Sequence, residues 1–453
     1  MKKPTDRITP PEHTRAATAQ SKHSDSSPSE RPHNRRKRKR AEAETLKPDP
    51  PRCFSGSDRF HCPRPSARRR RKRNRIEQTP AGSSRIWAYS PIDSSSFKDK
   101  VVVVSYNILA VENASKHPDL YFKVPKRFMD WDRRKVLIRE EIDHYDASIV
   151  CLQEVDRFDD LRGLFRKDGF KGVYKPRTGE ADDGCAIFWK EELFTLLHEE
   201  NIEFKSFGLR NNVAQLCVLK MNQNMSELDE HTQRMLPPTR SRSFVIGNIH
   251  VLFNPNRGDI KLGQVRLLLE KASKLSQEWG CIPVILCGDL NSIPQSPLYQ
   301  FLASSKLDIQ LHGRRSISGQ VEFLTSQNWK ARSSWASISK PVFHRWSEEE
   351  LRLATGSGRV TQLHHHLKLC SAYRGIPASC RTRDDCGEPL ATSFHSKFIG
   401  TVDYIWHTEE LVPVKVLETL PVDILKKIGG LPSKTPGKSI EYPLACTTLL
   451  DSQ

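Results

Sequence analysis

The sequence has few of the features that mark membrane-spanning or secreted proteins. Only 37% of its 453 residues are hydrophobic, less than the roughly 45–50% of compact globular chains. No stretch approaches the about 18 apolar residues of a membrane-crossing helix, and the N-terminus has no apolar signal core. The 11 cysteines are scattered and odd in number, unlike a disulfide framework. We therefore expect an intracellular chain with reduced thiols and no membrane contact, in which part of the sequence does not fold.

Positive charge is concentrated at one end of the chain. Lys and Arg number 72 and Asp and Glu 54, for a net charge of +18. Residues 1–85 contain 24 of the basic and 9 of the acidic residues, a net of +15, which leaves +3 for residues 86–453. A basic chain suggests an acidic partner, with nucleic acid first. Most of this charge, however, lies outside the nearly neutral body of the chain.

Residues 1–85 are predicted to form a disordered basic tail, because they are rich in Pro, Ser, Lys and Arg and show no apolar periodicity. Basic runs at 35–40 and 68–73 are typical of nuclear targeting or of non-specific contact with RNA. A tail that is merely solvated is the third interpretation. Nuclear targeting predicts that the protein occurs in the nucleus and the cytoplasm.

After the tail, the sequence has the pattern of a mixed α/β domain. Short apolar runs predict strands, and amphipathic stretches at 131–145 and 259–278 predict helices. The mixture predicts packed sheets with outer helices in one domain over 95–440. Within it, residues 312–365 lack clear periodicity and are interpreted as a loop-rich insertion with one helix at 347–354. The predicted strands lie at 101–106, 148–152, 184–189, 213–219, 244–249, 284–287 and 401–406.

Polar residues recur at the ends of these predicted strands. A strand end presents a side chain rigidly, so several such ends can converge on one pocket, although any single one could be a turn former. Carboxylate and amide oxygens suit Mg²⁺ better than Zn²⁺, and Mg²⁺ commonly acts on phosphate substrates. We therefore expect a shared site for phosphate chemistry, and the lack of a Walker loop argues against NTP-driven chemistry. The strand-end residues are Asn107, Glu154, His250, Asp289, Asn291 and Asp403.

Other conspicuous side chains are interpreted as structural. The three histidines at 364–366 and the cysteines Cys370, Cys380 and Cys386 match no common zinc-finger spacing. The Trp and Arg residues within 329–345 could stack on RNA bases, but packing of the insertion is the favoured interpretation. Four cysteines within predicted strands are expected to be small buried hydrophobes. They are Cys151, Cys185, Cys217 and Cys287.

Several ordered motifs resemble the endonuclease/exonuclease/phosphatase superfamily. They are SYNILA at 105–110, CLQEVD at 151–156 and GDLNS at 288–292. Further motifs are similar to those of the carbon catabolite repressor type of poly(A) deadenylase, in its plant form. They are NIHVLFNP at 248–255, KLGQV at 261–265, SAY at 371–373, GEP at 387–389 and GTVDYIW at 400–406. Together the motifs extend over most of the predicted domain.

The resemblance implies a four-layer α/β sandwich, with two packed mixed sheets and outer helices. It implies a Mg²⁺-dependent 3′-to-5′ exoribonuclease that shortens the poly(A) tails of mRNA and releases AMP. Poly(A) RNA is then the substrate, and a multi-subunit deadenylase complex with a second deadenylase subunit is the implied partner. Members that join such a complex commonly carry a leucine-rich repeat segment, and no such repeat precedes residue 100 in this sequence.

The resemblance also implies a role for most strand-end residues. Glu154 would bind the catalytic Mg²⁺, and Asn107 would support that metal and the scissile phosphate. His250 would stabilise the charge of the phosphate in the transition state. Asp289 would orient or activate the attacking water, and Asn291 would hold a phosphate oxygen or the leaving group.

Three further roles are implied by the resemblance. Asp403 matches the carboxylate that pairs with the family's final histidine. Pro255 and Phe398 match positions that line the adenine pocket, where a base stacks on the protein. Together with the strand-end residues, these positions imply a site that accommodates a phosphate and an adenine base.

The C-terminal end departs from the family pattern. The family closes its domain with Ser-Asp-His, whereas Ser433 of this chain is followed by Lys434 and Thr435, and no histidine follows His407. We expect residues 434–453 to form an atypical end that leaves the sheet without its last strand, and we do not expect His407 to replace the missing histidine.

Two alternative functions follow from this departure and from the breadth of the superfamily. The chain could be an RNA-binding or adaptor protein whose catalysis is impaired by the lack of the terminal Ser-Asp-His motif. It could also be a phosphodiesterase of the same superfamily that acts on another substrate, namely inositol or lipid phosphates or abasic DNA.

Overall fold

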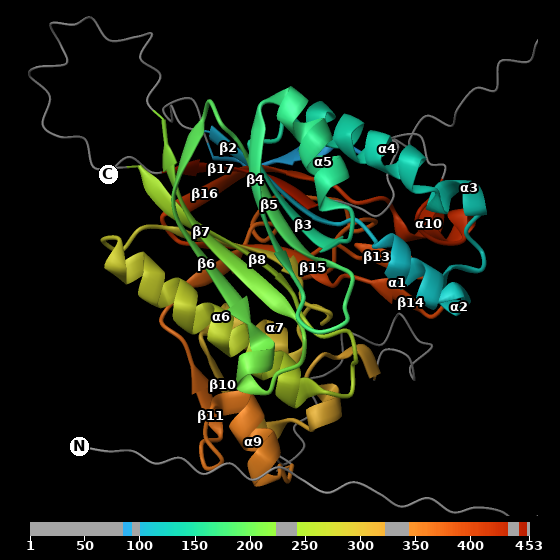
Figure 1. Cartoon of the computed structure of the whole chain (residues 1–453). Helices are drawn as coiled ribbons and strands as arrows, with labels where there is room; N and C mark the ends of the chain where they lie inside the picture. The colour runs from blue at the N-terminus through green and yellow to red at the C-terminus, as the bar shows by residue number, and fades with distance from the viewer. Residues whose placement is uncertain (1–84, 93–99, 223–241, 322–343, 434–443, 451–453) are drawn as a thin grey trace, which may run out of the picture. The chain divides into compact units, whose positions relative to one another are not determined.

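The computed structural model describes residues 85–92, 100–222, 242–321, 344–433 and 444–450. Within these residues, two large sheets pack face to face, and helices cover their outer faces (Figure 1). The predicted disordered tail lies outside the described residues except at its last position, and the domain limits inferred from sequence stay predictions.

Two large mixed sheets contain most of the strands. In spatial order, the seven-stranded sheet consists of β1 (Trp87–Tyr89), β16 (Leu411–Leu417), β17 (Leu444–Leu450), β2 (Lys100–Asn107), β3 (Ile149–Val155), β5 (Gly184–Lys190) and β4 (Phe170–Pro176). The six-stranded sheet consists of β12 (Leu369–Ser371), β15 (Asp403–Thr408), β9 (Val284–Asp289), β8 (Ser243–His250), β7 (Val213–Met221) and β6 (Phe194–Glu203). Both sheets are mixed, because β2 and β3 are parallel, as are β8 and β9, whereas the other pairs are antiparallel.

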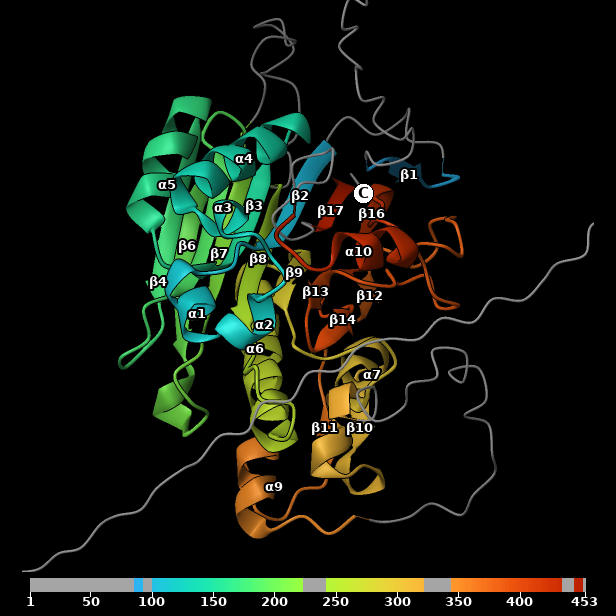
Figure 2. The ribbon, with the colours of Figure 1, turned by 90° about the vertical axis from the view of Figure 1, so that its right-hand side faces the viewer.

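Two small two-stranded sheets and the helices complete the described fold. One sheet pairs β10 (Lys306–Asp308) with β11 (Gln362–His364), and the other is a hairpin of β13 (Ser393–His395) and β14 (Phe398–Gly400). The helices are α1 (Val111–Lys116), α2 (Pro118–Tyr121), α3 (Lys126–Met129), α4 (Trp131–His144), α5 (Phe158–Phe165), α6 (Gly258–Glu278), α7 (Pro297–Ser304), α9 (Glu348–Thr355) and α10 (Val422–Ile428). Helices α1 and α2 lie near the β13–β14 hairpin (Figure 2). Ser396 N, in the turn of this hairpin, donates a hydrogen bond to Leu120 O of α2.

Three apolar clusters separate four layers. Between the sheets, Val103 of β2 and Cys287 of β9 belong to one cluster. Behind the seven-stranded sheet, Val104 of β2 packs in a cluster with α4 and α5, and behind the six-stranded sheet, residues of β8 and β9 pack against α6. Because β2 is covered on both faces, it is apolar at consecutive positions. The predicted four-layer α/β sandwich is confirmed.

The elements with a strong sequence pattern are where we predicted them. The predicted helices correspond to α4 and α6, and each predicted strand is present, although β15 is shifted by two residues from the predicted 401–406. Helix α4 begins after Asp130, whose side chain accepts a hydrogen bond of 3.0 Å from Arg133 N. Strand β6 has no clear pattern, because most of its side chains are exposed or partly exposed and several are charged.

The expectation that the sheet lacks its last strand is wrong. Strand β17 pairs antiparallel with both β16 and β2, so that the chain after 443 fills the place between them. The segment LACTTLL is apolar and rich in residues that favour strands. The departure from the Ser-Asp-His motif at 434–435 therefore changes the chain just before the strand and leaves the strand in place.

The described part of the predicted insertion contains regular structure. The helix predicted at 347–354 is α9, which begins with a capping box between Ser347 and Glu350. Strand β11 joins this segment to β10, and Leu353 of α9 is buried in the cluster that contains α6. The Trp residues at 329 and 335 lie outside the described residues.

The histidines and cysteines singled out in the sequence differ in their burial. The His365 side chain is buried, and its Nε2 lies 3.0 Å from Phe301 O. The three cysteines that follow it are exposed, whereas the four cysteines of the predicted strands are buried, as expected. Among the described residues, no cluster of three or more His, Cys, Asp or Glu side chains could hold a metal ion. No described helix has the length and apolarity needed to cross a bilayer.

Candidate active site

The two parallel strand pairs bring four of the predicted residues to one edge of the sandwich. Asn107 and Glu154 lie at the ends of β2 and β3 in one sheet, and His250 and Asp289 lie at the ends of β8 and β9 in the other. Asn107 Nδ2 lies 3.1 Å from Glu154 Oε1 and 3.1 Å from Asp289 Oδ2. This amide therefore joins carboxylates from the two sheets across the site.

Glu154 is held as an ionised carboxylate. Its Oε2 accepts hydrogen bonds of 3.1 Å from both Ala110 N and Asn113 Nδ2. Burial raises the pKa of Glu154, but the electrostatic effect of His250 and the hydrogen bonds from Asn113, Asn107 and Ala110 outweigh it, so that the pKa lies below its usual 4.5. The backbone of Glu154 has a left-handed φ of 55°, a strained conformation that is common at functional sites.

Asp289, Asn291 and His250 form a second group beside this carboxylate. Asn291 N donates to Asp289 Oδ1 at 2.8 Å, and Asn291 Nδ2 lies 3.1 Å from His250 Nε2. His250 Nε2 is 3.6 Å from Asp289 Oδ2. Burial raises the pKa of Asp289 above its usual 3.8, although His250 and two hydrogen bonds oppose this shift. The group places a carboxylate and an imidazole within reach of one bound molecule.

Asp403 lies in the same site, and one of its oxygens has no partner within the described part of the chain. It is directly opposite Asp289 in the register of β15 and β9, and its Oδ2 accepts a hydrogen bond of 2.5 Å from Thr392 Oγ1. Its Oδ1 is buried and has no hydrogen-bond partner among the described residues. Burial, and then the charge of Asp289, raise the pKa of Asp403 well above its usual value. His407 is four positions further along β15, with Nδ1 2.9 Å from Thr408 O, and does not supply the missing partner.

The two residues predicted to contact adenine lie on separate elements, one at the start of a strand and one in a loop. Phe398 begins β14, and its ring centroid is 5.9 Å from that of His395. Pro255 lies between β8 and α6, where its carbonyl accepts a hydrogen bond of 3.4 Å from Ser318 Oγ. The adenine-binding role of both residues stays a prediction.

The predicted metal ligands differ in their orientation. The Glu154 carboxylate is a hard oxygen donor that fits a divalent cation. Asn107, however, directs Nδ2 toward the carboxylates, while its Oδ1 accepts a hydrogen bond of 3.0 Å from Leu109 N. The role of Asn107 as a metal ligand therefore stays a prediction, whereas its contact with both carboxylates is a feature of the structure.

Two supporting side chains were beyond the reach of sequence patterns. Asn113 of α1 reaches back to Glu154 from a helix with no motif of its own. Lys261 of α6 is fully buried, and its Nζ donates to Leu252 O at 2.6 Å and to Asn291 O at 2.7 Å. Burial lowers the pKa of Lys261 to about 7. The KLGQV motif singled out the segment that contains Lys261. Nothing in the sequence indicated that its side chain would bind the backbone carbonyls of Leu252 and Asn291.

Asn113→Ala is expected to lower kcat/KM for hydrolysis about tenfold, because outer-shell partners of a metal ligand commonly contribute 10–100-fold. The Mg²⁺ concentration that gives half-maximal activity should rise, since Glu154 loses one of the hydrogen bonds that orient it. Asn201→Ala is the matched control, because it removes an exposed Asn–Glu hydrogen bond. An Asn113→Ala enzyme with an unchanged Mg²⁺ requirement would contradict this role.

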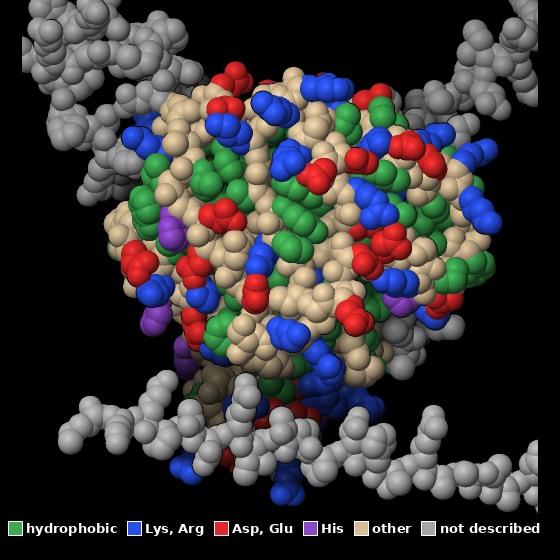
Figure 3. Space-filling model, in the orientation of Figure 1, with side chains coloured by type: hydrophobic (Ala, Val, Ile, Leu, Met, Phe, Trp, Pro, Cys, Tyr) green, Lys and Arg blue, Asp and Glu red, His purple; other side chains and the backbone are tan. Residues whose placement is uncertain are grey.

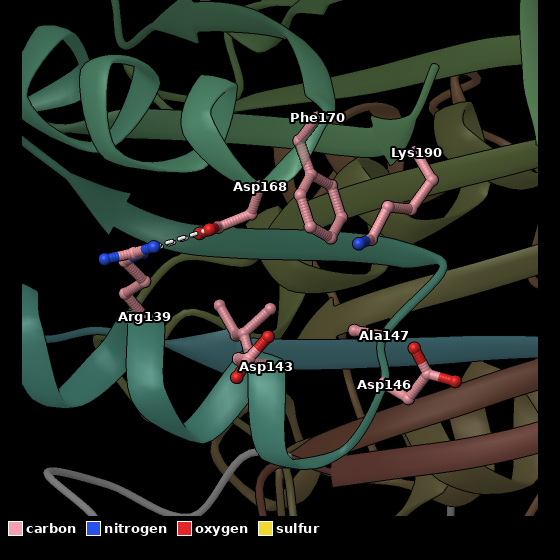
Figure 4. A pocket seen from close by; sticks show the side chains of 8 residues that line it. Arg139, Asp143, Asp146, Ala147, Asp168, Phe170 and Lys190 are labelled. Carbon is pink, nitrogen blue, oxygen red and sulfur yellow. Dashed lines mark hydrogen bonds and ion pairs between the residues drawn. The ribbon is translucent and has the colours of Figure 1, made fainter. Parts of the chain in front are cut away.

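A small cavity at the opposite end of β3 and the face drawn in Figure 3 lack comparable chemistry. A cavity of about 10 Å³ is lined by Arg139, Asp168 and Lys190, among others (Figure 4). It lies at the start of β3, the end opposite Glu154, and Arg139 Nη2 is paired with Asp168 Oδ1 at 2.5 Å. The face in Figure 3 mixes acidic and basic side chains. These features do not compete with the strand-end cluster as a site for phosphate.

Comparison with known proteins supports the fold and the family. Residues 104–425 match the Endonuclease/Exonuclease/phosphatase family. The chain is 58% identical over 381 residues to carbon catabolite repressor protein 4 homolog 5 of Arabidopsis thaliana, covering 83% of each chain. It is 45% identical to homolog 3 of the same plant, over 81% of this chain and 79% of that protein.

A solved structure agrees with this assignment. The crystal structure of ANGEL2, a 2′,3′-cyclic phosphatase, has a TM-score of 0.62 and 30% identity, over 81% of this chain and 99% of that one. Enzymes of this family generally use divalent metal ions, typically Mg²⁺. The chain therefore belongs to the endonuclease/exonuclease/phosphatase family of hydrolases and, within it, to the nucleases and phosphodiesterases of the carbon catabolite repressor protein 4 group.

Proposed function

We propose that the chain is a Mg²⁺-dependent 3′-to-5′ exoribonuclease that shortens poly(A) tails and releases AMP. The main support is the convergence of Glu154, Asp289 and His250, with Asn107 bridging the two carboxylates. Metal-assisted hydrolysis of a phosphodiester uses a metal ligand, a group that orients water and a group that stabilises phosphate charge. The preference for poly(A) rests on the resemblance of motifs such as NIHVLFNP at 248–255 to those of the poly(A) deadenylases.

The residues present fit a magnesium ion. The described residues hold no set of three or more His, Cys, Asp or Glu side chains that could bind a metal alone. Mg²⁺ does not require such a set, because it is usually bound by one or two carboxylates, water and the phosphate of the substrate. Glu154 would hold it, and the ion would neutralise charge on the scissile phosphate.

The protein side chains would perform the remaining steps. The Asp289 carboxylate would orient the attacking water and take its proton at Oδ2. The bond between phosphorus and the 3′-oxygen of the preceding nucleotide would break, and that oxygen would take a proton from solvent. His250 would stabilise the phosphate charge, and Asn291 would fix the His250 ring through its contact of 3.1 Å with Nε2. The same arrangement suits any phosphodiester, so the base next to the scissile bond has to be recognised elsewhere, and we assign that role to Phe398 and Pro255.

The setting in the cell is also a proposal. The basic runs at 35–40 and 68–73 favour a location in the nucleus as well as the cytoplasm. Partnership with a multi-subunit deadenylase complex rests on family likeness, and a role in mRNA turnover follows from the proposed activity.

A second candidate is an RNA-binding or adaptor protein with impaired catalysis. It is favoured by one observation: Asp403 Oδ1 is buried without a partner among the described residues, and no histidine follows His407 in the sequence. An enzyme in which that histidine completes the site would lose catalytic power without it. This candidate predicts RNA binding without cleavage.

A substrate panel distinguishes these functions. With Mg²⁺, we expect the full chain to convert 5′-labelled oligo(A) into a ladder of single-nucleotide steps and to release AMP. Oligo(U), abasic DNA, inositol phosphates and adenosine 2′,3′-cyclic phosphate should be hydrolysed more slowly. Faster hydrolysis of any of the last three would replace the proposal by a phosphodiesterase or phosphatase function, and binding of oligo(A) without products would favour the impaired protein.

A further inference from the structure

A cavity of about 290 Å³ lies next to the strand-end cluster and has no part in the proposed catalytic or base-binding roles. Its position follows from the chain: three of its lining residues come from the loop that follows His250, and Asn211 precedes Asn212, whose Nδ2 donates to His250 O at 2.9 Å. We call this cavity the arginine pocket. Its lining residues are Arg177, Arg210, Asn211, Leu252, Asn254 and Arg257.

The lining of the arginine pocket has the chemistry of an anion site. It contains three guanidinium groups and two side-chain amides, and no carboxylate is among its lining residues. Guanidinium groups bind phosphate through two parallel hydrogen bonds. The residues that line the pocket therefore offer hydrogen-bond donors and positive charge to whatever enters it.

Buried carboxylates outside the lining hold two of these arginines in place. Arg177 Nη1 lies 3.1 Å from Asp183 Oδ1, and Arg257 Nη2 lies 2.7 Å from Asp259 Oδ2. Both aspartates are nearly inaccessible to solvent, and Asp259 Oδ1 is also 3.9 Å from Arg314 Nη1. Arg314, which does not line the pocket, also pairs with Glu350 at 2.9 Å. Arg177 and Arg257 are thus each balanced by a buried carboxylate, and any excess positive charge in the pocket comes from the third arginine.

Arg210 contributes a charge with no counterion among the described residues. It is exposed, and it lies in a left-handed turn with a φ of 72° just before β7. The neighbouring loop is tied to this turn, because Thr178 N donates to Asn211 O at 3.1 Å. The side chains of Arg177 and Arg210 therefore come from two connected loops that face the same cavity.

The order of strands places the arginine pocket on one side of the site. In the six-stranded sheet, β15, β9, β8 and β7 are consecutive, so the pocket at β7 and β8 lies beyond His250 on the side away from Asp403. Asn254 follows His250 by four positions, so their Cα atoms are at most about 14 Å apart. A nucleotide chain whose scissile phosphate lies at His250 can therefore reach the pocket.

We propose that the arginine pocket binds an internucleotide phosphate of RNA adjacent to the scissile one. This inference rests on the proposed nuclease function and deepens it. Glu154, Asp289 and His250 surround one phosphate, and the pocket supplies donors for a second phosphate of the same chain. The site then favours a chain with at least two internucleotide phosphates over a dinucleotide, independently of the base.

Binding measured without cleavage tests this proposal. Fluorescence anisotropy with 5′-fluorescein-labelled A6 RNA, in EDTA and about 0.15 M salt, gives the affinity of the full chain, and unlabelled ApA is added as a competitor. Arg210→Gln should weaken A6 binding about tenfold, because a charge-assisted hydrogen bond to phosphate is lost. The slope of log affinity against log salt should fall by about 0.7, and the affinity for ApA should change less than twofold.

Two further variants and three outcomes complete the test. Arg210→Lys keeps the charge and should restore part of the A6 affinity, whereas Arg359→Gln, an exposed arginine near β11, should leave both affinities unchanged. Unchanged A6 binding in Arg210→Gln would overturn the proposal. So would an equal loss for A6 and ApA, which would place Arg210 at the scissile phosphate, or displacement of A6 by inorganic phosphate as effectively as by RNA. Because cleavage is not measured, failure of the nuclease proposal would not produce any of these results.

Discussion

Glu154→Gln is expected to lower kcat for oligo(A) hydrolysis by about 10³-fold, while the protein stays folded. Gln keeps an oxygen that can accept from Ala110 N and Asn113 Nδ2, so these two hydrogen bonds can persist, whereas the hydrogen bond from Asn107 Nδ2 is lost because the new amide nitrogen is itself a donor. It removes the negative charge that would hold Mg²⁺ beside the scissile phosphate, and the loss of one preorganised electrostatic group at a reacting phosphate commonly costs about 10²–10³-fold. Single-turnover cleavage of 5′-labelled A20 RNA measures the loss of rate. Thermal unfolding of the same variant, measured in parallel, shows whether the protein stays folded.

A matched control separates the charge of Glu154 from charge in general. Glu410→Gln removes an exposed carboxylate after β15 and should leave kcat unchanged. Wild-type activity in Glu154→Gln would exclude Glu154 as the metal ligand. A large fall in its unfolding temperature would instead show that the carboxylate is needed for the fold. If the wild-type chain itself leaves the RNA intact, the same pair of variants is compared in a chain that carries Lys434→Asp and Thr435→His, which recreate the family's terminal motif.

The residues at the strand ends could be predicted from the sequence, because an apolar run marks each strand and the fold then brings the ends of these strands together. Asn107, Glu154, His250 and Asp289 each follow an apolar run, and two pairs of parallel strands bring them to one edge. Asn113 could not be predicted, because it reaches Glu154 from a short helix across 41 positions of sequence. Its contact depends on how α1 lies over the end of β3, which no local pattern specifies.

The arginine pocket and the last strand escaped prediction for different reasons. The pocket is assembled from the ends of β4, β7 and β8, so that no single stretch of sequence contains it. Strand β17 has a clear apolar pattern, but a missing family motif at 434–435 led us to expect a missing strand as well. The motif and the strand are separate physical features: one supplies a side chain and the other supplies backbone hydrogen bonds between β16 and β2.

Restoring the family's terminal motif is expected to raise kcat by about 10²-fold or more. Ser433 is already present, so Lys434→Asp combined with Thr435→His recreates Ser-Asp-His at 433–435. Asp403 matches the carboxylate that pairs with this histidine in the family, and its buried Oδ1 has no partner among the described residues. Positioned histidines acting as acid or base contribute about 10²–10⁴-fold.

A double-mutant cycle assigns this gain to the histidine and Asp403 acting together. In the chain with both substitutions, Asp403→Asn should remove most of the added activity, whereas the same change in the wild-type chain should cost much less, because the carboxylate has no histidine to orient. Single-turnover rates of A20 cleavage for the four proteins give the coupling. Equal effects of Asp403→Asn in both backgrounds would show that the histidine works without this carboxylate. No gain from Lys434→Asp with Thr435→His would mean that the strand-end residues on the two sheets already form the complete catalytic site.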